Sequence, residues 1–378
     1  MEKLNRPRIL KTSPIILALY LTVQTIFSCT AQENPASGIK FSGYVDAYYA
    51  RYSDSVGSGK LERYGYESPI GNSFGVNLAQ LTVADTLSKV RVTITLQAGD
   101  MPKAIWSPIY NYIQEANAGI KLCNNVWIDA GFFKSQVGAE YMTSKDNICS
   151  FQSIISWTEP FYQSGVRLTY RPGKVFTGSL YVVNGFNQFV ATNKKKAVGL
   201  QLTDTNDSGK CNITYNNLLS DDTPDTISMS HWRLWNNLVF NDSLSKKWLV
   251  QFGLDFITQQ NSSIASTETY TSYSTAWGAG AMVTFKYKIC KYFSIHARME
   301  TLDDPQGLLT GPDNYVANNP QRQLIGETFG VEYSPTKNAY IRLEGRELEM
   351  ASDEKIFYNN GVSTSNRGEL MLNLGVSF

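Results

Sequence analysis

Apolar and polar residues alternate along most of the chain, and this alternation predicts β-strands. At the end of the chain, Leu370, Leu372, Leu374, Val376 and Phe378 share one face, and small or mostly polar residues share the other. Further segments alternate in the same way: 90–99, 248–256, 277–288 and 293–300. An apolar face opposite a polar one fits a half-buried strand of a soluble sandwich, and it equally fits a strand between lipid and water.

The connections between these segments decide between the two readings, because they alternate in length. About sixteen strand-like segments are separated by short, turn-forming connections and by longer ones. The short ones are 85–89, 123–125, 171–174, 204–210, 241–247, 287–291 and 334–338. The long ones lie near 54–71, 101–113, 136–163, 188–195, 258–271, 304–325 and 352–367. One connection breaks the alternation: the one near 220–225 is expected to be short, although its place in the order calls for a long one. This arrangement predicts an all-β, up-and-down antiparallel transmembrane barrel of about 16 strands.

A closed barrel requires the last strand to pair with the first, since an open edge would leave backbone groups unpaired in lipid. The segment 41–52 is the expected partner of the last strand. The terminal Phe378 resembles the C-terminal signature of outer-membrane barrels, and it implies recognition by the barrel-assembly machinery. Outer-membrane lipid is the expected surrounding, and a homotrimer is plausible for a barrel of this size.

The N-terminus predicts export from the cytoplasm. Basic residues precede an apolar run at 15–27, which is followed by small residues, so residues 1–31 read as a signal peptide and 32–378 as the barrel domain. A lipoprotein signal with lipidated Cys29 is the rival reading. The run is too short for a transmembrane helix. The expected location is the bacterial outer membrane.

Composition narrows the function classes. The chain has 34 basic and 33 acidic residues and no block of like charge that suggests a nucleic-acid partner. Its five cysteines show no metal-ligand spacing, and it has only two histidines. No cofactor and no metal site are expected.

The polar face of the strands predicts a charged lumen. Both signs of charge are interleaved there with Gln, Thr, Ser, Asn and Gly, and water is the simplest way to satisfy them in a wide barrel. We expect the following residues to line the pore or its constriction: Lys121, Asp129, Glu140, Glu159, Tyr162, Arg167, Arg298, Glu300, Arg342, Glu344 and Arg346. Each charge could instead pair with a neighbour and only stabilise the wall.

The connection 136–165 is long and rich in apolar residues, so it is expected to fold into the barrel rather than extend into water. It would then narrow the pore. Glu140 and Glu159 are expected to face Arg167, Arg298 or Arg342 across the opening.

The same region carries a family resemblance. VWIDAGFFKSQVGAEYMTSKDN, followed by TEPFYQSGVRLTY, resembles the putative β-barrel porin-2, OmpL-like family of outer-membrane proteins. GFFKSQVGAE is also similar to a signature of phosphate- and oligosaccharide-selective porins, although this chain has only Lys145 where those porins have a lysine-rich third loop. The resemblance implies a porin.

The sequence therefore predicts an outer-membrane porin through which small hydrophilic solutes or ions diffuse passively, without enzymatic activity. Two alternatives stay open. An outer-membrane hydrolase of the barrel-lipase kind would need a serine within reach of His231 or His296 on the outer wall. A plugged barrel with a structural or adhesive role would need a third loop that closes the lumen.

Overall fold

A computed structural model describes residues 38–53, 64–65, 67–262, 274–310, 322–351, 355–359 and 361–378. The predicted signal peptide and Cys29 lie outside these residues, as do parts of the long connections near 54–71, 258–271, 304–325 and 352–367. In the described part of the chain, no helix is long and apolar enough to cross a membrane.

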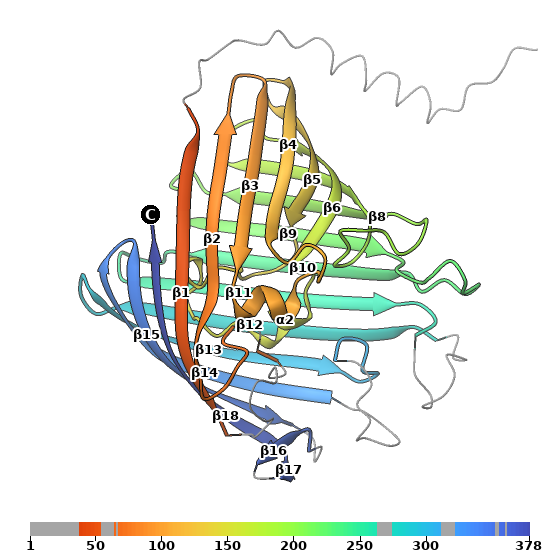
Figure 1. The fold of residues 1–378 in the computed structure, drawn as a ribbon. Helices are drawn as coiled ribbons and strands as arrows, with labels where there is room; N and C mark the ends of the chain where they lie inside the picture. Colours follow the sequence, from red (N-terminus) through yellow and green to blue (C-terminus); the bar gives the residue numbers. More distant parts are fainter. Residues whose placement is uncertain are drawn as a thin grey trace, which may run out of the picture.

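Sixteen antiparallel strands of the described residues form one closed barrel (Figure 1). Each strand pairs with its sequence neighbour, except that β15 pairs with β18. The strands are β1 Lys40–Tyr52, β2 Phe74–Thr86, β3 Val90–Ala98, β4 Ile113–Cys123, β5 Val126–Lys134, β6 Tyr162–Tyr170, β7 Phe176–Val183, β8 Ala197–Thr205, β9 Cys211–Ser220, β10 Arg233–Asp242, β11 Trp248–Gln259, β12 Ala276–Lys288, β13 Phe293–Asp304, β14 Arg322–Thr336, β15 Ala339–Met350 and β18 Asn366–Ser377. The predicted barrel of about sixteen strands is confirmed.

In the described parts of the long connections lie three short helical segments and one small hairpin. They are α2 Asp100–Ile105, the 3-10 turn η1 Ser144–Asp146, α3 Ile154–Thr158, and the hairpin of β16 Phe357–Asn359 with β17 Val362–Thr364.

The first and last strands close the barrel, as the sequence predicted. β1 pairs with β18 from Tyr44 opposite Ser377 to Tyr52 opposite Glu369. Beyond the ladder, the N–H and C=O groups of Gly43 and Phe378 exchange two hydrogen bonds of 3.1 Å. A Cβ atom on Gly43 would lie 2.3 Å from the Phe378 ring, so only a residue without a side chain avoids a steric clash with the ring at this position.

The two faces of the strands differ as the alternation requires. On β18, Leu370, Leu372 and Leu374 are exposed, while Met371 and Asn373 between them are about 1% exposed. Because the closed ladder satisfies the backbone, the apolar outer face is free to meet lipid. Aromatic pairs such as Trp248 with Tyr287 lie at the short-turn end of this face, where an interfacial belt belongs.

Short turns set the register on one side of the barrel. Between β8 and β9, the Asn206 side chain accepts hydrogen bonds from the backbone N–H groups of Lys210 and Cys211, at 2.9 and 3.3 Å. Gly209 adopts φ 69°, which a residue without a Cβ reaches at no steric cost. Such turns leave little freedom in the pairing of the flanking strands.

One predicted connection is wrong. β9 ends at Ser220 and pairs there with Arg233, the first residue of β10, so the connection is long and covers 221–232. The residues Ile227, Met229 and His231 alternate as in a strand, but β9 has no residue left to pair with them. The alternation of short and long connections is therefore complete.

Candidate functional site

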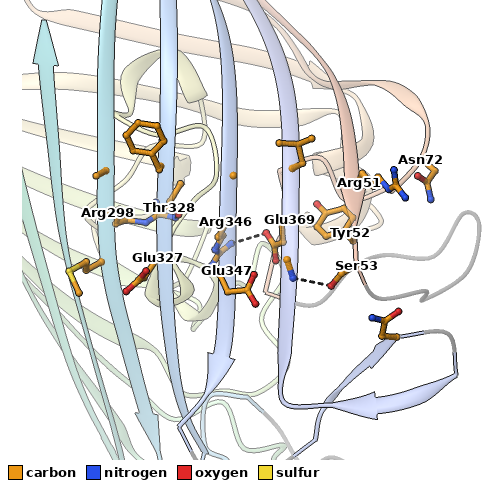
Figure 2. Close-up of a pocket in the computed structure, with 17 residues that line it drawn as sticks. Arg51, Tyr52, Ser53, Asn72, Arg298, Glu327, Thr328, Arg346, Glu347 and Glu369 are labelled. Carbon is orange, nitrogen blue, oxygen red and sulfur yellow. Dashed lines mark hydrogen bonds and ion pairs between the residues drawn. The ribbon is translucent and has the colours of Figure 1, made fainter. Parts of the chain in front are cut away.

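The inner face of β13, β14, β15 and β18 carries a dense set of charges. Figure 2 shows Arg298, Thr328, Arg346 and Glu369 in one row across these strands, and the register pairs them in that order. This row contributes to the lining of a pocket of about 1040 Å³. All four residues are at most 5% exposed.

Ion pairs connect these charges to one another. Arg346 lies 3.1 Å from Glu300 and 3.7 Å from Glu369, and Arg298 lies 3.4 Å from Glu300. Further pairs join Arg342 to Glu332 at 2.6 Å, Lys286 to Glu332 at 2.6 Å, and Arg367 to Glu369 at 2.6 Å. An unpaired charge that is this deeply buried would be very costly. These charges are therefore satisfied by direct pairing, and not by water as expected from the sequence.

The connection 135–161, called the third loop from here on, is bonded to this wall through its backbone. Glu344 of β15 accepts hydrogen bonds from the N–H groups of Ser150 at 2.6 Å and Phe151 at 2.8 Å. Glu300 of β13 accepts one from the N–H of Ile154 at 2.6 Å. Backbone donors to a carboxylate are stronger than neutral pairs, at about 1.5–3 kcal/mol each.

Arginines of the same wall hold the carbonyl groups of the loop. Arg298 donates to the Phe151 carbonyl at 2.6 Å, and Arg342 donates to the Ser144 and Asn147 carbonyls at 2.7 and 3.0 Å. Wall acids thus bind the donors of the third loop, and wall arginines bind its acceptors.

Small residues of the wall let the third loop approach closely. A Cβ atom on Gly280 of β12 would lie 2.1 Å from Ile155 of α3, and one on Gly253 of β11 would lie 2.9 Å from Ala139. Ile154 and Ile155 are fully buried in an apolar cluster with wall residues such as Met282. The N-terminus of α3 is capped by Ser153, whose hydroxyl accepts from the Ser156 N–H at 3.3 Å.

Of the two acids of the third loop, Glu140 lies beside an arginine expected for it and Glu159 does not. Glu140 meets Arg298 at 3.0 Å, within the set of arginines expected for it. Glu159 instead faces Asp255 of β11. Burial, and next the Asp255 charge, raise the pKa of Glu159 well above its ordinary value. This favours the protonated carboxyl group, which can hydrogen-bond to Asp255.

Other predicted site residues lie elsewhere on the wall. Arg167 pairs with Asp129 at 3.2 Å on the β5–β6 hairpin, and Lys121 lies one row further along β4, opposite Trp127. Tyr162 is the first residue of β6 rather than part of the loop, and its ring stacks on Phe189 with centroids 4.3 Å apart. These residues do not join the arginines of β13 and β15.

Arg91 of β3 lies on the inner face and is not among the pore residues expected from the sequence. Its guanidinium binds Asp129 through two nitrogens, with Nε 2.6 Å from Oδ1. The register places Arg91 opposite Gly119 and Gly119 opposite Asp129, so the two side chains meet over a residue without a side chain. Counting from the short turns does not give this row, because β3 and β4 are joined by the long connection 99–112 and the β4–β5 pairing is irregular between Lys121 and Cys123.

The two histidines differ in their surroundings. His296 faces inward and lies 2.9 Å from Glu344. His231 Nδ1 lies 3.0 Å from the Ser262 hydroxyl, but both belong to long connections rather than to the outer wall. The Ser262 oxygen also accepts from the Gln259 side chain and donates to the Gln260 carbonyl, at 2.6 and 2.8 Å. Among the described residues, no group of His, Cys, Asp and Glu is placed to hold a metal ion.

Solved structures with the same fold are porins and outer-membrane channels. The anion-selective porin of Comamonas acidovorans is 9% identical, with 90% of this chain and 99% of that chain covered and a TM-score of 0.63. The outer-membrane channel DcaP of Acinetobacter baumannii is 13% identical, with 90% and 97% covered and a TM-score of 0.60. The trimer form of OmpT of Vibrio cholerae is 12% identical, with 91% and 100% covered and a TM-score of 0.54.

Among curated proteins, no sequence match is found. The model of one family, described as "Putative beta-barrel porin-2, OmpL-like", matches residues 38–378, a range that contains every strand of the barrel. The match agrees with the closed barrel, its apolar outer face and its charged inner face. The chain belongs to this family of OmpL-like β-barrel porins of the bacterial outer membrane.

Proposed function

We propose that the protein is a passive diffusion channel for small hydrophilic solutes and ions, and that the third loop narrows its lumen. The observation that carries this is the bonding of the loop backbone to Glu344 and Glu300 on the inner face of β15 and β13. A loop attached to the inner wall takes up part of the cross-section of the barrel.

The residues of this wall have a structural role in the proposal. Glu300, Arg342, Glu344 and Arg346 are at most 4% exposed, so they hold the loop in place rather than contact solutes. Glu140 acts with them through Arg298. Solutes pass along the opposite side of the lumen, where Arg167 and Arg91 on the inner face of β6 and β3 are partly exposed.

The proposal includes no catalysis. The Ser262 hydroxyl, the candidate nucleophile near His231, directs its proton to the Gln260 carbonyl, and neither residue lies on the outer wall where a lipid substrate would reach it. A plugged barrel is the other candidate, favoured by the burial of inward charges such as Arg298, Glu344 and Arg346 on β13 and β15. The partly exposed side chains of Arg91 and Arg167 on the opposite wall favour a lumen that is not fully closed.

The proposal also covers the ends and the assembly of the protein. Residues 1–31 act as the signal peptide, and Phe378 is the residue that the barrel-assembly machinery reads. The trimer form of the OmpT structure supports a homotrimer in outer-membrane lipid.

Uptake of neutral sugars of increasing size into liposomes that contain the purified protein tests the constriction. Deletion of 140–157 should raise the size limit for entry, because it removes the residues of the third loop that bond to Glu300, Arg342 and Glu344 of the wall. Deletion of 222–231, in a long connection outside the third loop, is the control and should leave the limit unchanged. An unchanged limit in the first variant would show that the third loop does not narrow the path.

A further inference from the structure

The inner wall of the barrel has two halves that differ in exposure. On β13 and β15, Arg298 and Arg342 donate to backbone carbonyl groups of the third loop and are only 1% and 2% exposed. On the opposite half, the side chains of Arg91 on β3 and Arg167 on β6 are 28% and 26% exposed. Because their outward neighbours are apolar, these exposed atoms face the water of the lumen.

Arg91 and Arg167 enclose a single carboxylate. Asp129 lies in the same row of the inner wall, 2.6 Å from Arg91 Nε and 3.2 Å from Arg167 Nε, and its side chain is 0% exposed. Two guanidinium groups therefore face the lumen. The Asp129 carboxylate, which partly neutralises them, is buried behind them and has no exposed surface. The net charge of the row is +1, presented entirely by its cationic groups.

Aromatic rings hold both guanidinium groups in place. Arg91 lies over the Trp127 ring at 4.5 Å from its centroid, and Arg167 lies over the Phe133 ring at 4.8 Å. Cation–π contact and the shared Asp129 restrict both side chains, so their charge stays at a fixed position.

The neighbouring charges on this half of the wall do not neutralise the net positive charge of the Arg91–Asp129–Arg167 row. The adjacent inward positions Thr93, Asn117, Thr169 and Ser179 are neutral. Lys121, one row away, adds a second positive charge. On the described inner face of β3–β8, the other acid is Glu115, which lies 3.3 Å from Lys134 and is offset by it.

From this arrangement we infer that the channel prefers small anions, and that the Arg91–Asp129–Arg167 cluster is the main determinant of the preference. The inference rests on the proposed function, since it concerns solutes that pass the same lumen. It assigns selectivity to β3–β6 rather than to the arginines of β13 and β15, which acids and the third loop neutralise. A fixed unit charge about 5 Å from an ion path in water changes the local ion concentration about fourfold.

The reversal potential in a KCl gradient tests the inference, with the purified protein in a planar bilayer. We expect a chloride-over-potassium permeability ratio of roughly 3 or more from a net positive lumen wall. Arg167→Gln should bring the ratio toward 1, because Arg91 and Asp129 then form a neutral pair. Asp129→Asn should raise it, because both arginines keep their charge.

Arg51→Gln is the matched control. Arg51 is exposed on the outer face of β1, opposite Leu370, so the same substitution should leave the ratio unchanged. Mobility on unheated gels shows whether each variant forms the barrel. An open channel that prefers potassium, or an Arg167→Gln ratio equal to that of Arg51→Gln, would overturn the inference and leave the proposed channel intact. An absence of openings would instead overturn the proposed function.

Discussion

At the scale of single residues, Glu344 is the point where the wall and the third loop are joined most closely. It accepts two backbone N–H groups of the loop and lies 2.9 Å from His296, all inside the barrel. A neutral amide cannot accept all of these donors, because half of it is itself a donor.

Glu344→Gln should therefore lower the free energy of unfolding by about 2–4 kcal/mol, as expected for losing charged hydrogen bonds in a buried site. Urea unfolding in detergent micelles measures this. Glu347→Gln is the control, because Glu347 lies on the same strand but is exposed. Equal stability of the two variants would contradict the assigned role of Glu344.

Glu159 is expected to make the stability of the third loop depend on pH. Burial first, and the Asp255 and Glu140 charges next, raise its pKa, so its folded form favours the proton. For a group with a raised pKa in the folded state, the stabilising contribution is complete below the unfolded pKa and is lost as pH rises through the folded pKa. Burial also raises the pKa of Glu67, to about 8, so two groups act in the same direction.

Limited proteolysis of the third loop should therefore become faster as the pH rises toward alkaline values. Glu159→Gln should weaken this pH dependence, because the amide stays neutral beside Asp255. Glu67→Gln is the comparison that separates the two acids. A pH profile of Glu159→Gln that matches the unmodified protein would show that Glu159 is not one of the titrating groups.

At the scale of elements, the packing of α3 against β12 depends on a missing side chain. Gly280→Ala would place a Cβ atom 2.1 Å from Ile155, which must move away from the wall. Overpacking of this kind costs about 1–3 kcal/mol. Faster proteolytic cleavage of the third loop is the expected result.

Gly178→Ala on β7 is the matched control for this prediction. Its nearest atoms lie at 3.4 Å, an ordinary contact distance, so the added methyl group should be accommodated. If both variants are cleaved at the same rate, the close approach of α3 to Gly280 does not secure the loop.

The strands could be predicted from the sequence because two local signals agree. Alternation assigns each face, and the turn residues fix where neighbouring strands meet. The prediction failed near 220–225 because Ile227, Met229 and His231 alternate without a pairing partner. Alternation is a property of one segment alone, whereas a β-strand also requires a neighbouring strand with which its backbone can form hydrogen bonds.

The candidate site was less predictable for the same physical reason. Periodicity places Arg298 and Arg342 on the inner face, but it contains no information on which loop atoms reach them across the barrel. The partner of Glu159 was missed because a protonated carboxyl group can pair with another acid, which a rule of opposite charges does not anticipate.

At the scale of the whole molecule, closure depends on the contact of β1 with β18 and its extension to Phe378. The Phe378 ring fills the space above Gly43. Phe378→Ala should lower the amount of folded protein in the outer membrane, because the closing contact loses its apolar cover. Leu87→Ala, at an exposed apolar residue of a short turn, is the control. Equal amounts of both variants in isolated outer membranes would contradict this role.

The central claim is that the barrel is an open channel. Single-channel conductance of the purified protein in a planar bilayer tests it most directly. The buried wall under the third loop and the exposed wall at Arg91 and Arg167 predict discrete, long-lived openings with a current that is proportional to voltage over small voltages. A correctly folded barrel that passes no current would contradict the account and would favour a plugged barrel.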